Sequence, residues 1–343
     1  MRSVYKRERI VISRQSSANS GGVNSSNMEA LLCHENLESR TGANNGAVFP
    51  YQTLPMRLQV SPQLDPVVAS DPRVVCNMLE EERTSMELVT DYCNTVQPEL
   101  KPHMRKIVTD WMLEVCEDQE AGVEVFLLAV HYLDTFLSNT TIRKSQFQLA
   151  AASCLLLASK YVAVAPISGL QLVLYTDHSI SLQELLHWEM QVLSSLRWQL
   201  GVPTTLSFLN QLLPRLTCLS SLPSHLLATL TRHATTIATL AATEYAFILA
   251  PRSVIAAASL QAAFNGLRLT NSEQLAMEVA NLVACPFDML TRSTLAIEAV
   301  LAPPTQGQVR SLPAIQTHKM SRHEKEGSTT PTNTFDVWQA LAA

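Results

Sequence analysis

What this sequence lacks excludes several classes of protein. Only 10 of its 343 residues are glycine, and long stretches are rich in alanine and leucine, which favours helices over sheets. The net charge of −5 gives no sign of general binding to nucleic acid or to an anionic membrane. The most apolar stretch, 149–158, is interrupted by Ser153 and falls short of the roughly 18 residues that a membrane span needs.

The seven cysteines are too dispersed for a zinc site or a dense disulfide framework. Several lie in apolar helical runs, where a free thiol packs as a small hydrophobic group. This usage is typical of a reducing compartment, the cytosol or the nucleus. The basic N-terminus lacks the apolar core of a signal peptide. It weakly resembles a mitochondrial presequence, but we interpret it as a disordered extension ahead of Met28.

Catalytic signatures are also lacking. The chain has no GxxxxGK[ST] phosphate loop, no GxGxxG, no HExxH and no kinase catalytic signature. Its nine histidines lie far from any nucleophile-like serine or cysteine motif. The sequence therefore predicts a non-catalytic protein without a cofactor or a metal.

Hydrophobic periodicity indicates an all-α protein between two polar ends. Residues 1–70 and 303–343 show little periodicity, and we expect both to be disordered. Within 71–98, Asp71 followed by proline predicts the start of an N-terminal helix that runs to about Cys93.

From Pro102 the chain is predicted to form two consecutive five-helix units, 99–200 and 201–302. Residues 149–153 read LAAAS and 255–259 read IAAAS, each in the most alanine-rich helix of its unit and 106 residues apart. After a first helix from Pro102, the expected helices cover approximately 122–138, 143–162, a short segment after Pro166, 181–196, 204–214, 223–239, 251–266, 271–282 and 285–301.

Two charged residues distinguish the first unit from the second. Lys160 closes the third helix, and the residue 106 positions later is Gly266. Glu189 lies on the fifth helix, and its counterpart is Leu295. A lysine in a last helical turn could simply favour the helix dipole, with Glu189 as its ion-pair partner. Alternatively, both groups offer hydrogen bonds to the backbone of another protein.

Four segments, 104–119, 126–138, 149–160 and 174–198, resemble the cyclin box of D-type cyclins. The resemblance extends over about 70–302 and implies two tandem cyclin boxes and a regulatory, non-catalytic role. Five positions match signatures of cyclin boxes generally: Arg105, Asp134, Leu149, Lys160 and Glu189. The family's arginine and aspartate form a buried structural ion pair, which here implies Arg105 with Asp134. The family's lysine and glutamate contact the kinase, which implies the same role for Lys160 and Glu189.

The resemblance also implies a substrate-docking patch. Its members here are Met104, Val108, Trp111, Glu114 and Gln148. In the family this patch holds an arginine-and-leucine peptide of substrates and kinase inhibitors. The leucine would lie on the Met/Trp surface and the arginine at the glutamate. The alternative is that Met104 and Val108 are only core residues of an amphipathic helix.

Two short motifs near the ends resemble features of the D type. Leu31, Cys33 and Glu35 match the LxCxE peptide that binds the retinoblastoma pocket. Thr330, followed by proline, resembles a phosphodegron that a ubiquitin ligase adaptor reads once it is phosphorylated. The resemblance thus implies a nuclear and cytoplasmic protein that activates a cyclin-dependent kinase of the 4 and 6 class. Its targets would be retinoblastoma-family proteins at the G1/S transition.

One departure from the family leaves a second function open. Residues 161–164 read YVAV where the family usually has an acidic residue, so a cyclin-fold adaptor with weak or no kinase activation is the alternative. A DNA-bound transcription factor with two cyclin-like repeats is a more distant one. The five arginines and five acidic residues of 201–300 provide no basic surface for phosphates and argue against it.

Overall fold

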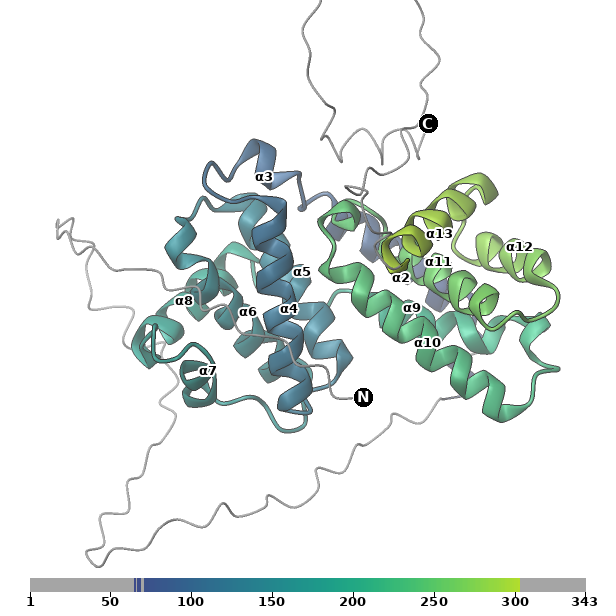
Figure 1. Cartoon of the computed structure of the whole chain (residues 1–343), viewed down its shortest axis with the longest axis horizontal. Helices are drawn as coiled ribbons and strands as arrows, with labels where there is room; N and C mark the ends of the chain where they lie inside the picture. The colour runs from purple at the N-terminus through teal and green to yellow at the C-terminus, as the bar shows by residue number, and fades with distance from the viewer. Residues whose placement is uncertain (1–64, 66, 69–70, 303–343) are drawn as a thin grey trace, which may run out of the picture. The chain divides into compact units, whose positions relative to one another are not determined.

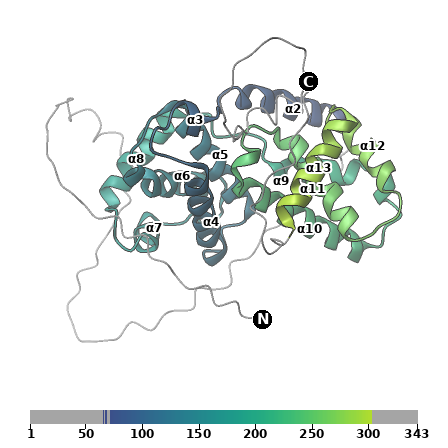
Figure 2. The same ribbon diagram turned by 45° about the horizontal axis from the view of Figure 1, so that its top comes forward.

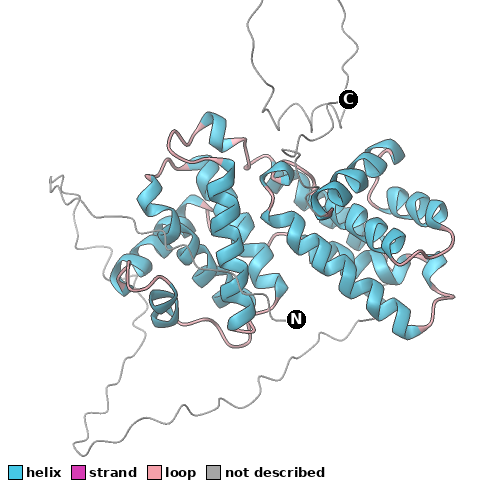
Figure 3. Ribbon diagram, viewed as in Figure 1, coloured by secondary structure: helices cyan, strands magenta, loops and turns pink. Residues whose placement is uncertain are grey.

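The computed structural model describes residues 65, 67–68 and 71–302 (Figure 1). In this part of the chain every regular element is a helix (Figure 3). No helix among these residues is long and apolar enough to cross a membrane. The terminal segments that the sequence predicts to be disordered lie almost entirely outside the described residues.

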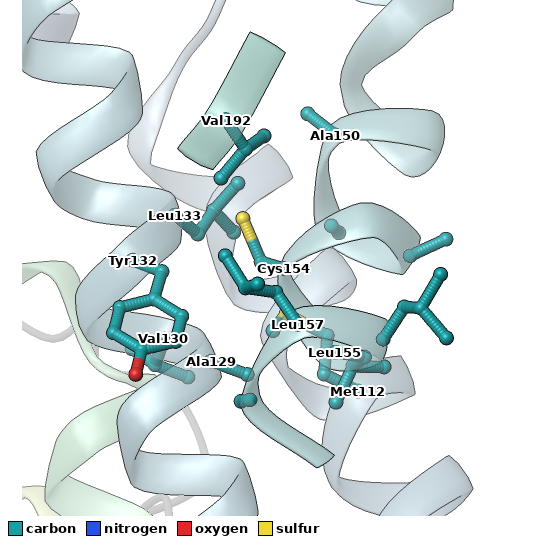
Figure 4. Packing of buried hydrophobic residues seen from close by; sticks show 14 of the residues in the cluster. Met112, Ala129, Val130, Tyr132, Leu133, Ala150, Cys154, Leu155, Leu157 and Val192 are labelled. Carbon is teal, nitrogen blue, oxygen red and sulfur yellow. The ribbon is translucent and has the colours of Figure 1, made fainter. Parts of the chain in front are cut away.

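The first bundle is built around one helix that is buried on nearly all sides. Its members are α4 (Pro102–Asp118), α5 (Val123–Asn139), α6 (Phe147–Val162), α7 (Gly169–Tyr175) and α8 (Leu182–Ser195). Every residue of α6 from 149 to 159 is buried, as expected for a helix without a polar face. In Figure 4, Cys154 of α6 lies among core side chains that include Leu133 of α5 and Val192 of α8.

The second bundle repeats this plan. It consists of α9 (Thr205–Leu212), α10 (Ser224–Thr243), α11 (Arg252–Gly266), α12 (Ser272–Leu282) and α13 (Phe287–Leu301). Its central helix is α11, in which residues 253–264 are all buried. The predicted all-α fold with two tandem five-helix repeats is therefore confirmed for the described residues.

Local capping signals in the sequence fix where several helices begin. Ser181 accepts a hydrogen bond from the backbone N–H of Glu184 (3.2 Å), and the Glu184 carboxylate accepts one from the Ser181 N–H (2.8 Å). This reciprocal capping box satisfies N–H groups that the helix itself leaves unpaired. It sets the start of α8, and with it the position of Glu189 on that helix.

The N-terminal helix α2 (Pro72–Met86) is capped by Asp71 as predicted but ends earlier than expected. The prediction of a helix to Cys93 was wrong, because a separate short helix, α3 (Tyr92–Thr95), follows a turn. The two helices pack against different bundles. Helix α2 lies along the second bundle (Figure 2), and its Met78 and Leu79 pack against the core of that bundle, whereas Tyr92 is buried in the core of the first. The chain must turn between them.

Candidate protein-binding surfaces

A buried ion pair positions the helix that carries one of the candidate surfaces. The Arg105 guanidinium on α4 donates to both carboxylate oxygens of Asp134 on α5, at 2.8 and 2.7 Å. The two side chains are only 2% and 8% exposed. Burial by itself lowers the pKa of Arg105, but the charge and hydrogen bonds of Asp134 raise it overall, so the guanidinium stays charged.

The same arginine ties the two bundles together. Its two Nη atoms donate to the backbone carbonyls of Thr243 and Ala242, at the end of α10, over 3.0 and 3.1 Å. The Tyr92 hydroxyl donates to Asp134 at 2.9 Å. The pair therefore connects α3, α4 and α5 with the second bundle, and its role is to hold these elements in place.

Lys160 and Glu189 meet at the surface of the first bundle. Lys160 lies in the last turn of α6, and its Nζ is 3.1 Å from both carboxylate oxygens of Glu189 on α8. The side chains are 36% and 13% exposed, so neither is sealed inside the bundle. An ion pair with this much exposure contributes about 0–1 kcal/mol to folding, which leaves both groups able to bond a partner.

Exposed apolar side chains follow Lys160 along the chain, at the end of α6, in the loop after it and on α7, which contacts α6. We call the following five residues the apolar collar: Tyr161, Val162, Val164, Leu170 and Leu174. Val164 is 90% exposed, and Leu174 on α7 is 60% exposed. The backbone N–H of Ile167 donates to Ser159 Oγ (3.3 Å), which anchors the loop that presents Val164. Several exposed apolar groups within 14 residues of chain favour a surface that receives another protein.

Sequence reasoning noticed the unusual 161–164 segment but missed Leu170 and Leu174. Their spacing of four residues in a short helix was the available signal, because it places both side chains on one face. The opposite side of α7 is occupied: Leu172 and Val173 are buried in the core. Which of these leucines faced solvent was decided by the packing of α7.

The predicted docking patch lies along one side of α4. Met104, Val108 and Trp111 are half-buried, and their buried sides pack against the core of the first bundle. Glu114 is exposed one turn further along. Gln148 is half-buried on α6, which packs beside α4.

Sequence reasoning missed one residue of this surface. Ile107 is 49% exposed and lies three residues after Met104 and four before Trp111, on the same side of α4. This spacing was the signal that could have found it. We call Met104, Ile107, Val108 and Trp111 the docking strip.

The remaining predicted site residues cannot be placed. Leu31, Cys33 and Glu35 of the LxCxE match and Thr330 of the phosphodegron match lie outside the described residues. Among the residues that the structure describes, no group of three or more His, Cys, Asp or Glu side chains could hold a metal ion. A cavity of about 80 Å³ between the bundles, lined partly by Arg105 and His131, is well below the roughly 300–1,000 Å³ of a small-molecule site.

Comparison with known proteins agrees with this architecture. Residues 73–201 match the family "Cyclin, N-terminal domain", and residues 203–302 match "Cyclin, C-terminal domain". The "G1/S-specific cyclin-D3" of Bos taurus is 41% identical over 239 residues, which cover 69% of this chain and 80% of that protein. The "G1/S-specific cyclin-D2" of Xenopus laevis is 36% identical, with 80% of this chain and 94% of that protein covered.

A solved structure has the same fold. The crystal structure of a viral cyclin from herpesvirus saimiri aligns with a TM-score of 0.57 at 23% identity, over 65% of this chain and 96% of the viral chain. The chain therefore belongs to the cyclin family, and within it to the D-type cyclins. Membership in this family makes it a regulatory subunit for cyclin-dependent kinases.

Proposed function

We propose that this protein binds and activates a cyclin-dependent kinase of the class that contains kinases 4 and 6. In this way it directs phosphorylation of retinoblastoma-family proteins at the G1/S transition. The observation that carries the proposal is the Lys160–Glu189 pair, which lies partly exposed beside the apolar collar. The names of the relatives, "G1/S-specific" cyclins of the D type, support the same stage of the cell cycle.

The chemistry of this surface suits a kinase that must be held in one conformation. The ammonium of Lys160 donates and the carboxylate of Glu189 accepts, so together they bond free carbonyl and N–H groups of a partner's loop or helix end. The collar supplies apolar area, at about 1.5–3 kcal/mol for each valine or leucine side chain that becomes fully buried.

Activation then follows from differential binding. A cyclin that binds the active kinase conformation more tightly than the inactive one shifts the population toward the active state. In that state the kinase's own lysine–glutamate ion pair is seated and its activation loop is ordered. Catalysis belongs to the kinase, and this chain contributes the surface.

Charge reversal at Lys160 tests the proposal. We expect Lys160→Glu to weaken binding to the kinase by at least about 10-fold, because a carboxylate would face Glu189 and the ammonium donors would be lost. Arg232→Glu is the matched control, since Arg232 is an exposed cation on α10 of the second bundle. Binding is measured by titration of purified kinase, and activation by phosphorylation of a retinoblastoma fragment.

The same measurements separate the second candidate function, a cyclin-fold adaptor with weak or no kinase activation. This alternative is favoured by the apolar 161–164 segment, in which Val164 is 90% exposed where the family usually has an acidic residue. Equal kinase binding by the wild type and Lys160→Glu would support the adaptor. So would tight binding of the wild type with no gain in phosphorylation.

The other partners belong to the same proposal. The docking strip with Glu114 and Gln148 would hold the arginine-and-leucine peptides of substrates and inhibitors. Leu31, Cys33 and Glu35 would bind the retinoblastoma pocket, and phosphorylated Thr330 would bind a ubiquitin ligase adaptor. We place the protein in the nucleus and the cytoplasm.

Purification of the full chain from cells, followed by mass spectrometry, tests these partners together. Recovery of none of them would contradict this part.

A further inference from the structure

The docking strip runs between two ends of opposite charge. At the C-terminal end of α4, Glu114, Glu117 and Asp118 are exposed. The Asp118 carboxylate accepts a hydrogen bond from the Tyr175 hydroxyl of α7. At the N-terminal end lie four exposed residues that we call the basic cluster: Lys101, His103, Arg143 and Lys144.

Hydrogen bonds explain why residues about 40 positions apart in sequence gather here. The Gln97 side chain donates to the carbonyls of Leu137 and Thr140 and accepts from the Ile142 N–H at 3.1 Å. The Glu99 carboxylate accepts from the Lys144 N–H at 2.9 Å. The segment that leads into α4 therefore lies against the segment that leads into α6.

The basic cluster stands out in a chain with a net charge of −5. Among the described residues, Lys101, Arg143 and Lys144 form no ion pair, and the carboxylate of Glu99 contacts only the backbone N–H of Lys144 in this cluster. The cluster is continuous with the docking strip: Lys101 is the N-cap of α4, and Lys144 precedes Gln148 by one helical turn. The positive end of the α4 dipole adds to the potential.

We propose that the docking strip accepts an extended peptide in one direction, with its arginine at Glu114 and an anionic side chain at the basic cluster. This inference rests on the proposed docking function and adds the requirement for the anion. The anion is a carboxylate or a phosphorylated side chain. Charge complementarity then aligns the peptide and excludes its reverse orientation, in which like charges would meet at both ends.

Helix geometry gives the spacing of the anion. Ile107, in the middle of the strip, lies six residues from Lys101, which is about 9 Å at 1.5 Å per residue. An extended peptide advances about 3.3 Å per residue, so this distance corresponds to about three peptide positions. The anionic residue is therefore expected about three positions after the leucine, on the side away from the arginine.

The experiment compares labelled peptides that share an arginine-x-leucine core and differ in the third residue after the leucine. This residue is aspartate, phosphoserine, alanine or lysine, and binding to the full chain is followed by fluorescence anisotropy. We expect the aspartate peptide to bind about 3- to 10-fold more tightly than the alanine peptide, from two exposed charge contacts. Phosphoserine should bind more tightly still and lysine more weakly. The differences should shrink as salt is raised from about 50 mM to 300 mM.

Variants of the chain assign the effect to the basic cluster. The double substitution Lys101→Glu with Lys144→Glu should reverse the order of the aspartate and lysine peptides. Acidic residues near a helix N-terminus favour the helix, so α4 should still form. Arg232→Glu, with an equally exposed cation on α10, should leave the order unchanged.

Two outcomes would overturn the inference in distinguishable ways. In the first outcome, all four peptides bind equally well, and all bind more tightly than a control peptide with alanine in place of the leucine. The docking strip then binds peptides but does not recognise the anion. The proposed requirement for an anion then fails, while the proposed function of the docking strip as a peptide-binding surface stands. If none binds more tightly than that control peptide, both fail.

Discussion

Replacing Asp134 with alanine would leave the Arg105 guanidinium buried without a counter-charge. The present pair has two hydrogen bonds of 2.8 and 2.7 Å and side chains that are 2% and 8% exposed. Breaking such a pair from one side costs about 3–5 kcal/mol, because a charge remains out of water. Typical domains are stable by about 5–15 kcal/mol in total, so this one change should remove about a fifth or more of the stability.

Removing both partners should recover only part of this loss. Arg105→Met together with Asp134→Ala eliminates the unpaired charge, but it orphans groups that the pair now satisfies. The Tyr92 hydroxyl would lose its acceptor, and the Thr243 carbonyl would keep only the 3.3 Å hydrogen bond from the Thr109 hydroxyl. A buried polar group without a partner costs about 1–3 kcal/mol. The double variant should therefore be more stable than the sum of the two single losses predicts, yet clearly less stable than the wild type.

Chemical denaturation followed by far-ultraviolet circular dichroism measures these differences. The matched control is Asp110→Ala on the same helix, because Asp110 forms an ion pair of 2.8 Å with Lys106 at a partly exposed site. An exposed pair at this spacing contributes only about 0.2–0.5 kcal/mol. If Asp134→Ala shifts the unfolding free energy no more than Asp110→Ala does, the ion pair does not hold the bundles together as argued here.

Two further predictions concern buried titratable groups. Burial and the nearby Arg252, whose Nη1 is 2.9 Å from His131 Nδ1, lower the pKa of His131 well below its usual value. As the pH is lowered through about 6.5, the unfolded state therefore takes up a proton before the folded state does. The free energy of unfolding should then decrease by at most about 1.4 kcal/mol per pH unit. His131→Gln should flatten this dependence between pH 7.5 and 5.5, and identical profiles would contradict the assignment. Burial raises the pKa of Cys116 to about 12, so an alkylating agent at pH 8 should label the exposed Cys76 and leave Cys116 intact. Labelling is measured by mass spectrometry. Comparable labelling of both thiols would contradict the burial of Cys116, because α4 would have to open to expose it.

Much of the fold could be predicted because helix signals are local. The three- and four-residue spacing of apolar side chains, the capping boxes and the proline and glycine breaks all act within about one or two turns. The predicted starts of α10, α11 and α12 fall within a residue of those observed. The boundaries that differ involve tertiary contacts. Helix α10 continues past the predicted end at 239 to Thr243, whose carbonyl accepts from Arg105.

For the candidate sites, too, the sequence determines some features and the tertiary structure determines others. The chemical identity of Lys160 and Glu189, and their absence from the matching positions of the second repeat, can be read from the sequence. Their meeting cannot, since they are 29 residues apart on different helices and are brought together by the packing of α6 against α8.

Exposure was likewise decided by the neighbours of each helix. Along α4, the sequence offers Ile107 and Val108 as equal candidates for the docking surface, because both are apolar and adjacent. The core of the first bundle partly covers Val108 and leaves Ile107 about half exposed. Spacing along a helix determines which residues share a face, but only the packed bundle determines which face remains open to a partner.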